Sequence, residues 1–372
     1  MKFINCSYED FKEKVINKNI IMFGASSAWH YYFSCFSNIK EIILDNTVFI
    51  VDNDEKKQGK QFQIGEYIFK ICNPLKIEKR DDCVILITVS LAYQKSICEQ
   101  LMLMKLPDTM ECYSLPLMTY SIEKNSNECV EHYFENRETK KIPAIIHSFW
   151  FSKDEKTDLY KKCIESWYKF CPEFEIIEWN VENYDVTQCQ YTREAFEHKK
   201  WAFISDFARL DVINSYGGVY MDMDVELISS LDYLLYADSF FNRQEDGIID
   251  LGSGFGAQPG DKLVSEMLNT YKNRKLVNKD GSIDMTPQPE WLSSVWSRYG
   301  ITRCHDSKII DGSLILSNDY ISCGQKNANH NKPILGYHWH NGGWLDDTAR
   351  KLIADSLQSK DDLLKRYFYT MG

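Results

Sequence analysis

The sequence predicts an α/β protein with two domains. At 372 residues the chain is long enough for two domains of about 100–200 residues each. Its 44% hydrophobic and 14% aromatic content is typical of packed globular proteins. Short apolar runs alternate with helix-length segments, a pattern that favours a parallel, doubly wound sheet.

Charge, termini and cysteines restrict the class of protein. A net charge of −11 argues against a nucleic-acid partner, and an anionic substrate would need a metal ion or a local basic group. The N-terminus has no apolar signal-peptide segment, and no apolar run reaches the ~18 residues of a membrane-spanning helix. The twelve cysteines include no CxxC pair, which indicates buried thiols in a reducing compartment. We therefore expect a cytoplasmic protein, with peripheral contact at the inner face of the membrane left open.

Residues 1–120 have the pattern of a Rossmann-like domain. Apolar strands are expected at 19–23, 48–51 and 84–88. The first strand ends in Gly24, but Ser26 and Trp29 stand where a G-x-G-x-x-G fingerprint has glycines for close approach of a pyrophosphate. The sequence therefore departs from a dinucleotide-binding fingerprint.

The runs FGASSAW, IVDNDEKKQGKQFQIG and CNPLKI resemble the small Rossmann-like domain found beside bacterial sugar-modifying transferases. Two roles stay open for this domain. It could be a scaffold that docks a partner or a second copy of the chain, or a sugar-nucleotide sensor in which Asp52 bonds a ribose. Asp52 and Asp54 also have the Asp-x-Asp spacing, but no calcium-loop glycine follows, so we interpret them as a strand-end turn.

The second domain is expected to span residues 142–372, after a polar, charged linker at 121–141. It opens with an apolar strand at 144–151, a helix at 154–170 and the strand FEIIEW. This β-α-β beginning is expected of a sheet that binds a nucleotide at its strand ends. Trp150 would lie there and could stack on a base, although an aromatic residue in such a place is more commonly part of the core.

The stretch from Trp201 to Glu226 is the strongest candidate site. Its first part has helical periodicity, which places Asp206 and Arg209 on one face. Gly217 and Gly218 follow at the point where a left-handed residue commonly ends a helix. An Asp–Arg pair three residues apart is ordinarily a solvated surface pair, but its place just before an Asp-x-Asp segment favours a role in binding.

A strand is expected after the glycines, with Tyr220, Asp222 and Asp224 on the same side because side chains alternate along a strand. Mg²⁺ and Mn²⁺ prefer oxygen ligands, commonly one or two carboxylates together with substrate phosphates. We therefore predict that Asp222 and Asp224 bind such a cation. The cation would offset the charge of a departing diphosphate.

Later segments are expected to complete the site. Residues 250–260 are glycine-rich and should form a loop that lets backbone approach a ligand, and 287–296 is interpreted as an acceptor-side loop and helix. His338, or alternatively His340, could supply a nitrogen ligand to the metal. An amphipathic helix over 346–367 should pack on the core, with a membrane-surface role as the alternative.

The ordered segments IPAIIHSFW, SWYKFCPEFEIIEW, SDFARLDVINSYGGVYMDMDV and HWHNGGW resemble glycosyltransferase family 32, a group of DxD-containing sugar transferases. More distantly they are similar to the catalytic domain of the large clostridial glucosylating toxins. The resemblance covers about residues 142–344. It implies a GT-A fold, a nucleotide-sugar donor, a divalent metal and retention of the anomeric configuration.

The resemblance also implies roles for individual residues. The residues that it places at the donor are Trp150, Asp206, Arg209, Tyr220, Asp222 and Trp344. Asp222 and Asp224 match the aspartates at the metal, ribose and diphosphate, while Asp206 and Arg209 match residues that hold the donor sugar. Trp150 matches a residue that stacks on the base, and Trp344 matches a residue near the diphosphate. His338 aligns with the first histidine of the family's tail.

We therefore expect a metal-dependent, retaining glycosyltransferase that moves a hexose from a nucleoside-diphosphate sugar, with UDP favoured. The acceptor would be a hydroxyl of a capsular or other surface polysaccharide, or of a lipid-linked oligosaccharide. Two alternatives stay open. A metal-dependent phosphodiesterase would release sugar phosphate without an acceptor, and a non-enzymatic sensor built on residues 1–120 would bind its ligand without Mn²⁺.

Overall fold

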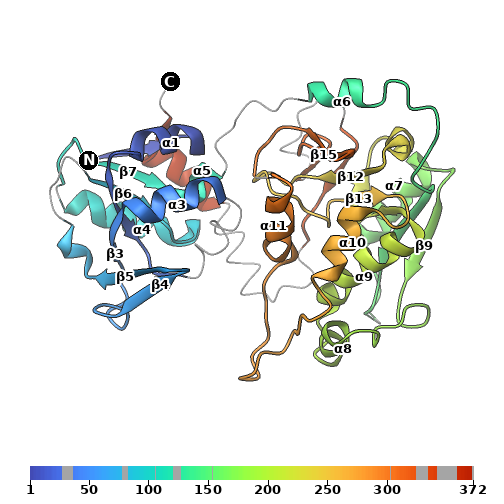
Figure 1. Ribbon diagram of the computed structural model, residues 1–372, viewed down its shortest axis with the longest axis horizontal. Helices are drawn as coiled ribbons and strands as arrows, with labels where there is room; N and C mark the ends of the chain where they lie inside the picture. Colours follow the sequence, from blue (N-terminus) through green and yellow to red (C-terminus); the bar gives the residue numbers. More distant parts are fainter. Residues whose placement is uncertain are drawn as a thin grey trace. The chain divides into compact units, whose positions relative to one another are not determined.

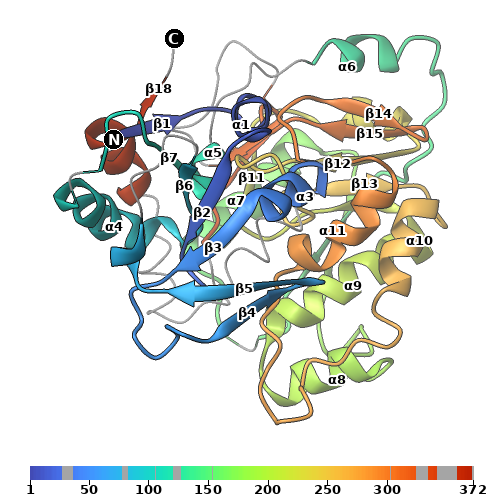
Figure 2. The same ribbon diagram turned by 60° about the vertical axis from the view of Figure 1, so that its left-hand side comes forward.

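The structure is a computed structural model. It describes residues 1–26, 37–77, 83–104, 106–119, 127–152, 154–301, 303–323, 334–341 and 358–370. The chain forms two compact units, one of Met1–Glu123 with Leu345–Gly372 and the other of Lys124–Trp344. Each unit has its own sheets and helices, which Figures 1 and 2 show from two directions.

The first unit is built on an eight-stranded sheet ordered β18-β1-β7-β6-β2-β3-β5-β4. Its strands are β1 (Lys2–Asn5), β2 (Asn19–Phe23), β3 (Thr47–Val51), β4 (Gln61–Ile64), β5 (Tyr67–Cys72), β6 (Cys83–Ile87), β7 (Glu111–Ser114) and β18 (Tyr369–Thr370). Neighbouring strands are parallel except in the hairpin of β4 and β5. The three strands expected from the sequence coincide with β2, β3 and β6 to within one residue. The predicted Rossmann-like parallel sheet is confirmed.

Helices cover both faces of this sheet. On one face α1 (Tyr8–Val15), which begins at a capping box of Ser7 and Asp10, contacts α3 (Ser37–Asn46). On the other face lies α4 (Leu91–Leu103) (Figure 2), whose buried side chains share an apolar cluster with Ile21 and Phe23 of β2. These two side chains share a face because side chains alternate along a strand. The short helices η1 (Pro74–Lys76) and α5 (Leu115–Met118) complete the unit.

The Asp52 segment forms the expected strand-end turn after β3. The Asp52 carboxylate accepts the backbone N–H of Ala25 at 2.7 Å and that of Asp54 at 2.8 Å. Lys57 Nζ lies 3.4 Å from the same carboxylate. Asp52 is buried, and its oxygens therefore tie together the loops after β2 and β3.

The C-terminal segment belongs to the first unit. Strand β18 pairs in parallel with β1, and the helical residues 358–366 place Leu363 in the same apolar cluster as Leu101. The described end of the expected amphipathic helix thus packs on a core; its beginning lies outside the described residues. The sequence predicted that the C-terminal segment, up to residue 372, belongs to the second domain. The structure assigns this segment to the first unit, because its buried apolar side chains pack in the core of the first sheet.

The second unit contains a seven-stranded sheet ordered β14-β15-β12-β13-β10-β8-β9 and a three-stranded sheet ordered β11-β17-β16. The larger sheet consists of β8 (Ile145–Phe149), β9 (Glu175–Trp179), β10 (Gly218–Tyr220), β12 (Ser239–Asn242), β13 (Phe255–Ala257), β14 (Lys308–Ile310) and β15 (Ser313–Leu316). The smaller one consists of β11 (Val225–Leu227), β16 (Ile321–Cys323) and β17 (Gly336–His338). Strands β10, β8 and β9 are parallel, whereas β13 is antiparallel to both neighbours. The segment 250–260 is therefore not all loop, since pairing with β10 and β12 makes three of its residues a strand.

Two helical layers enclose the larger sheet. On one face α9 (Trp201–Tyr216), α10 (Lys262–Asn269) and α11 (Gln288–Arg298) pack in one apolar cluster, and α8 (Gln190–Glu197) contacts α9 (Figure 1). A second cluster contains Trp167 of α7 (Asp158–Phe170) with residues of β8 and β10. Val130 and Tyr133 of α6 (Glu128–Tyr133) join this second cluster. Part of the expected linker at 121–141 is thus a packed helix, because its few apolar residues are buried.

The described part of the chain contains no helix long and apolar enough to cross a membrane. The cysteines whose surroundings are described are free thiols, and most of them are buried. Mixed α/β architecture with parallel strands in both large sheets confirms the predicted fold class.

Candidate active site

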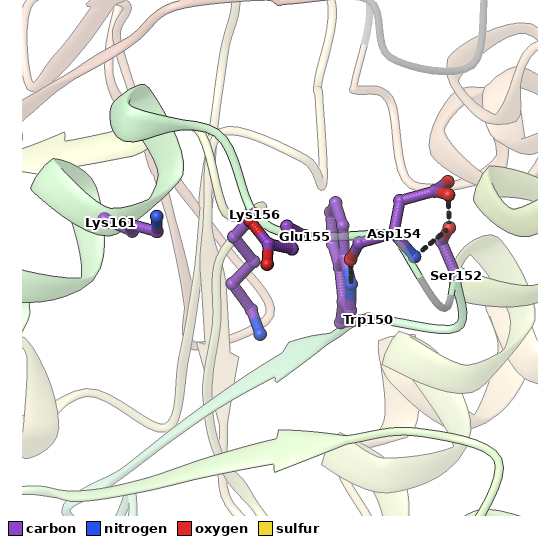
Figure 3. Close-up of a pocket in the computed structure, with 6 residues that line it drawn as sticks. All are labelled: Trp150, Ser152, Asp154, Glu155, Lys156 and Lys161. Atoms are coloured by element: carbon purple, nitrogen blue, oxygen red, sulfur yellow. Dashed lines mark hydrogen bonds between the residues drawn. The ribbon is translucent and has the colours of Figure 1, made fainter.

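Trp150 follows strand β8 at its carboxyl end. It lines a surface pocket of about 430 Å³ together with Ser152, Asp154, Glu155, Lys156 and Lys161 (Figure 3). Tyr160 packs edge-on against the indole, with ring centroids 5.3 Å apart. The Tyr160 hydroxyl accepts a hydrogen bond from Asn341 Nδ2 at 2.9 Å, and the backbone N–H of Asn341 donates to Asp224 Oδ2 at 2.7 Å. Two residues therefore connect this pocket to the Asp-x-Asp segment.

Helix α9 carries two site residues. Its apolar side chains, among them Phe203 and Phe207, are buried in the core of the second unit. Gly217 ends the helix with a φ of 67°, as the sequence predicted. Asp206 Oδ1 lies 3.2 Å from Arg209 Nη2, and their side chains are 14% and 7% exposed. The pair is therefore buried rather than solvated.

Two glycines let the chain turn from α9 directly into β10. Gly218 has a φ of 100°, and a Cβ there would lie 2.9 Å from both Nε2 of His147 and the carbonyl oxygen of Ile145. Nδ1 of buried His147 accepts the indole N–H of Trp179 at 3.0 Å, so Nε2 carries the proton and donates to the carbonyl oxygen of Gly217 at 3.0 Å. These contacts hold the end of the helix against β8, beside the Asp-x-Asp segment.

The Asp-x-Asp segment is a turn between two sheets, not the continuous strand that the alternation predicted. Strand β10 ends at Tyr220 in the larger sheet, and β11 begins at Val225 in the smaller one. Between them the N–H of Val225 donates to the carbonyl oxygen of Asp222 at 3.0 Å. The turn, rather than a strand pleat, directs the carboxylates of Asp222 and Asp224 toward the same place.

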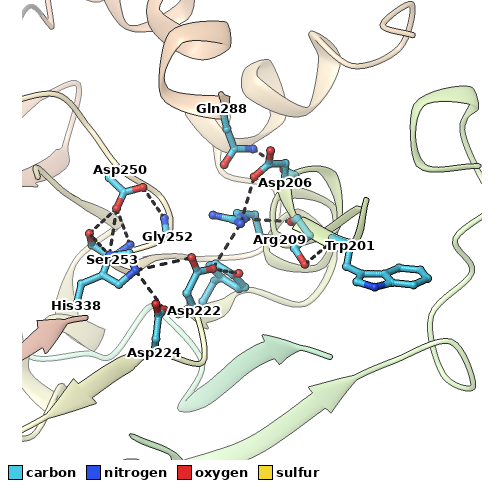
Figure 4. Close-up of polar contacts among 12 residues, drawn as sticks. Trp201, Asp206, Arg209, Asp222, Asp224, Asp250, Gly252, Ser253, Gln288 and His338 are labelled. Carbon is cyan, nitrogen blue, oxygen red and sulfur yellow. Dashed lines mark hydrogen bonds and ion pairs between the residues drawn. The ribbon is translucent and has the colours of Figure 1, made fainter. Parts of the chain in front are cut away.

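Asp222 is contacted from the helix and from the glycine-rich loop (Figure 4). Its Oδ1 lies 3.4 Å from Arg209 Nη2 and accepts the hydroxyl of Tyr220. The Arg209 guanidinium also lies over the Tyr220 ring, 4.6 Å from the centroid. A Cβ at Gly252 would lie 2.6 Å from Asp222 Oδ2. A side chain at residue 252 would therefore displace the Asp222 carboxylate from its present position.

His338 reaches the site through strand pairing. Strand β17 is antiparallel to β11 with His338 opposite Val225, and the N–H of Trp339 donates to the carbonyl oxygen of Asp224 at 3.0 Å. This register places His338 Nε2 3.2 Å from Asp224 Oδ1 and 3.9 Å from Asp222 Oδ2 (Figure 4). The histidine preferred from the sequence therefore does meet the two aspartates.

The buried charges shift one another's pKa. Burial raises the pKa of Asp206 to about 6 against the opposing effect of Arg209, and burial also raises that of Asp222. Burial would raise the pKa of Asp224 too, but the charge and hydrogen bond of His338 outweigh it and bring the value to about 2. Burial disfavours the His338 cation, yet Asp224 and other carboxylate contacts raise the pKa of His338 well above its usual value. The pKa of Asp222 is thus raised, whereas that of Asp224 is lowered.

Three further polar residues enter the site, and the sequence did not single them out. Asp250 Oδ2 and Ser253 Oγ lie 3.4 Å and 3.1 Å from Nδ1 of His338. Gln288, the first residue of α11, donates from Nε2 to the carbonyl oxygen of Asp206 (Figure 4). Glycine content signalled the loop around Asp250, but no local pattern signals a contact between residues 85 positions apart.

Two further predicted residues, His340 and Trp344, follow His338 in the sequence. His340 is exposed, and its ring centroid lies 3.8 Å from that of His338. Trp344 lies outside the described residues. The predicted residues that the structure brings into one contact network are Asp206, Arg209, Tyr220, Asp222, Asp224 and His338.

The donor atoms of Asp222, Asp224 and His338 fit one divalent cation. One ligand atom from each of the three lies within 4.8 Å of the others, and two carboxylate oxygens with one imidazole nitrogen are suitable ligands for such an ion. A second set, made of Asp250, His338 and His340, meets the same distance limit. The two sets share His338.

Comparison with known proteins identifies the family of this site. Residues 157–241 match the family described as the glycosyltransferase sugar-binding region containing a DXD motif. The match includes helix α9 and the Asp-x-Asp turn. The chain is a glycosyltransferase with a sugar-binding region of the DXD type. The predicted resemblance and the predicted class of enzyme are confirmed.

Two curated proteins from Schizosaccharomyces pombe are similar to this glycosyltransferase. Inositol phosphoceramide mannosyltransferase 1 is 22% identical over 237 residues, which cover 58% of this chain and 69% of the relative. Inositol phosphoceramide mannosyltransferase 3 is 25% identical over 164 residues, which cover 40% of this chain and 44% of the relative. Among solved structures, PaToxG Glycosyltransferase aligns with a TM-score of 0.35 and 12% identity over 46% of this chain and 75% of that one.

Proposed function

We propose that this glycosyltransferase is metal-dependent and retaining, and that it moves a hexose from a nucleoside-diphosphate sugar to a hydroxyl of a surface glycan or lipid-linked acceptor. The observation that carries the proposal is the contact network that joins the Asp206–Arg209 pair to Asp222, Asp224 and His338. The names of the two similar proteins state that they are mannosyltransferases, which supports a hexose, and that they act on inositol phosphoceramide, which supports a lipid-linked acceptor.

Asp222, Asp224 and His338 would hold a Mn²⁺ or Mg²⁺ ion. When bound, the ion supplies positive charge that offsets the charge of the departing diphosphate. This contribution is needed because the chain has a net charge of −11 and would otherwise repel an anionic donor.

The side chains around the turn would orient the donor. Asp206 and Arg209 are held rigidly by burial and by their mutual contact, so they can fix sugar hydroxyls in one geometry and convert binding into orientation. Trp150 presents an indole at a surface pocket, where a base could stack, and Tyr160 and Asn341 link this pocket to Asp224. We favour a UDP-sugar as the donor, in a cytoplasmic enzyme.

The donor and the metal can be tested together by thermal unfolding with UDP- and GDP-hexoses, with and without Mn²⁺. We expect one nucleotide class to raise the melting temperature only when Mn²⁺ is present, because a ligand of the native state stabilises it. Asp224→Asn should abolish this shift. It should also reduce transfer at least about 10³-fold, because several kcal/mol of charge stabilisation are lost.

Asp54→Asn is the matched control, since it changes the second aspartate of the other Asp-x-Asp turn and should leave binding and transfer unchanged. Full transfer by Asp224→Asn, or a donor shift that does not need metal, would contradict the proposal. The products separate it from a phosphodiesterase, which would release sugar phosphate without an acceptor. The anomeric proton of the product, measured by NMR, reports retention or inversion.

A further inference from the structure

The two ring nitrogens of His338 face different surroundings. Nε2 points to the Asp-x-Asp turn, 3.2 Å from Asp224 Oδ1. Nδ1 points the opposite way, 3.1 Å from Ser253 Oγ and 3.4 Å from Asp250 Oδ2 (Figure 4). A neutral imidazole carries a proton on one nitrogen and a lone pair on the other, and only the lone pair can bind a metal. The neighbours of Nδ1 therefore decide which nitrogen is free to act as a ligand.

The loop after Asp250 holds this carboxylate in place. The N–H of Gly252 donates to Asp250 Oδ1 at 3.0 Å. Asp250 Oδ2 accepts both the N–H of Ser253 at 3.1 Å and its hydroxyl at 2.6 Å. Ser253 is buried, so its hydroxyl is shielded from competing solvent. The one proton of that hydroxyl is committed to Asp250.

With its proton committed, the Ser253 hydroxyl can only accept a hydrogen bond from His338. Asp250 also offers Nδ1 only acceptor oxygens. Nδ1 is therefore protonated whether His338 is charged or neutral. When a cation takes the place of the proton on Nε2, the lone pair of neutral His338 lies on Nε2, which faces Asp222 and Asp224. We propose that Asp250 and Ser253 are positioning residues that fix the tautomer and orientation of His338, so that Nε2 binds the divalent cation held by the Asp-x-Asp turn. This inference rests on the metal dependence in the proposed function.

The same geometry decides between the two donor sets that share His338. In the set of Asp250, His338 and His340, Asp250 would be a metal ligand, yet its oxygens already accept three hydrogen bonds from its own loop. His340 is exposed, with a φ of 46°. Asp224 instead directs Oδ1 at His338 Nε2. Asp250 thus acts on the metal through His338, as carboxylates commonly do beside metal-binding histidines.

The test measures Mn²⁺ binding to the full chain without a sugar donor, by the electron paramagnetic resonance signal of free Mn²⁺. Removing a residue that orients a metal ligand commonly costs about 10–100-fold in affinity. We expect such a loss for Asp250→Asn and a smaller one for Ser253→Ala, because Asp250 still faces Nδ1 there. His338→Ala should lose at least as much as Asp250→Asn. Ser317→Ala is the matched control, since Ser317 is also a buried serine of this unit whose hydroxyl contacts an aspartate.

A second readout is the nitrogen coupling of bound Mn²⁺ in an electron spin-echo experiment. The unaltered protein should show an imidazole nitrogen on the metal, His338→Ala should not, and Asp250→Asn should show a reduced coupling at saturating Mn²⁺. Thermal unfolding verifies that each variant is folded. If Asp250→Asn does not fold, Ser253→Ala still tests the inference.

Three results would overturn the inference. Unchanged affinity and nitrogen coupling in both Asp250→Asn and Ser253→Ala would exclude positioning. A loss in Asp250→Asn equal to that in Asp224→Asn would make Asp250 a ligand, and an effect of Ser317→Ala as large as that of Ser253→Ala would make the loss unspecific. The proposed function fails differently: the unaltered protein would bind no Mn²⁺, or His338→Ala and Asp224→Asn would both bind it unchanged.

Discussion

The molecule contains two Asp-x-Asp turns, and they differ in what their oxygens contact. Each follows a strand of a parallel pair, β3 in the first unit and β10 in the second. At Asp52 the carboxylate accepts two backbone N–H groups and lies near a lysine. At Asp222 and Asp224 the carboxylates face Arg209 and His338, which come from a helix and from a distant strand.

The difference shows why the spacing of two aspartates is a poor predictor of a metal site. Backbone N–H groups of its own loops already satisfy the Asp52 carboxylate, so the turn is stable without a ligand. At the second turn, burial raises the pKa of Asp222, and two carboxylates stand close together. A bound cation would relieve that desolvation and repulsion, and for this reason we propose a cation site at the second turn and a structural role for the first.

The largest expected effect comes from making the same aspartate-to-asparagine substitution in each of the two turns. Asp222→Asn should reduce kcat/KM for transfer at least about 10³-fold, because it removes a metal ligand and the partner of Arg209. Asp52→Asn should leave transfer unchanged. Asp52→Asn should instead lower the free energy of unfolding by about 1–3 kcal/mol. The carboxylate accepts two backbone N–H groups, and in the variant one of these N–H groups would face the amide NH₂, which is not an acceptor.

Transfer kinetics together with hydrogen exchange of the β2 and β3 amides separate these outcomes. The comparison of the two turns breaks down if Asp52→Asn impairs transfer as strongly as Asp222→Asn does. It is sharpened if faster exchange after Asp52→Asn is confined to the first unit.

A smaller effect is expected when Arg209 becomes lysine. One ammonium group cannot keep the contacts to Asp206 and Asp222 together with the stacking on Tyr220. We expect kcat/KM to fall about 10²-fold, a loss of the size seen when an oriented charge is removed from a site. Steady-state kinetics with saturating Mn²⁺ measure it.

Arg137→Lys is the matched control for this substitution. Arg137 also stacks on a tyrosine, Tyr133, and pairs with an aspartate, Asp238. It lies in the same unit but touches none of the site residues among its described contacts. If Arg137→Lys and Arg209→Lys reduce kcat/KM equally, the substitution acts on folding and not on the binding or orientation of the donor.

The smallest expected effect is on stability. The pKa of Asp206 is raised to about 6 by burial, so between about pH 4 and pH 6 the folded protein binds more protons than the unfolded chain. The free energy of unfolding therefore falls as pH rises through this window. A rise of the pKa from its ordinary value to about 6 corresponds to about 3 kcal/mol. Asp206→Asn, which removes this charge but also the ion pair to Arg209, should stabilise the protein at pH 7.5 by about 1–2 kcal/mol.

Denaturant unfolding at pH 7.5 and pH 4.5 tests this prediction. The advantage of Asp206→Asn should shrink to less than half at pH 4.5, where the native aspartate is largely protonated. An advantage that is the same at both values, or a less stable variant at pH 7.5, would contradict the burial effect. Loss of transfer in the same variant would show that the site keeps a destabilising charge for its function.

Local patterns predicted much of the fold. Strand β2, helix α9 and its end at Gly217 match the expected bounds, because periodicity and glycine conformation act over a few residues. The Asp206–Arg209 pair was predictable for the same reason. The turn at Asp222 was not, since an alternating apolar pattern cannot distinguish one strand from two that belong to different sheets.

The sequence by itself therefore determined the α/β class, the family and the residues of the α9 and Asp-x-Asp segment, since all of these are written in contiguous positions. Only the tertiary structure decided that Tyr369 and Thr370 add a strand to the first sheet, and that Asp250 and Ser253 lie beside His338. It also decided that His338 meets Asp224, through the register of β17 on β11. Such contacts depend on how distant strands pair to bury apolar side chains, and no local pattern encodes that pairing.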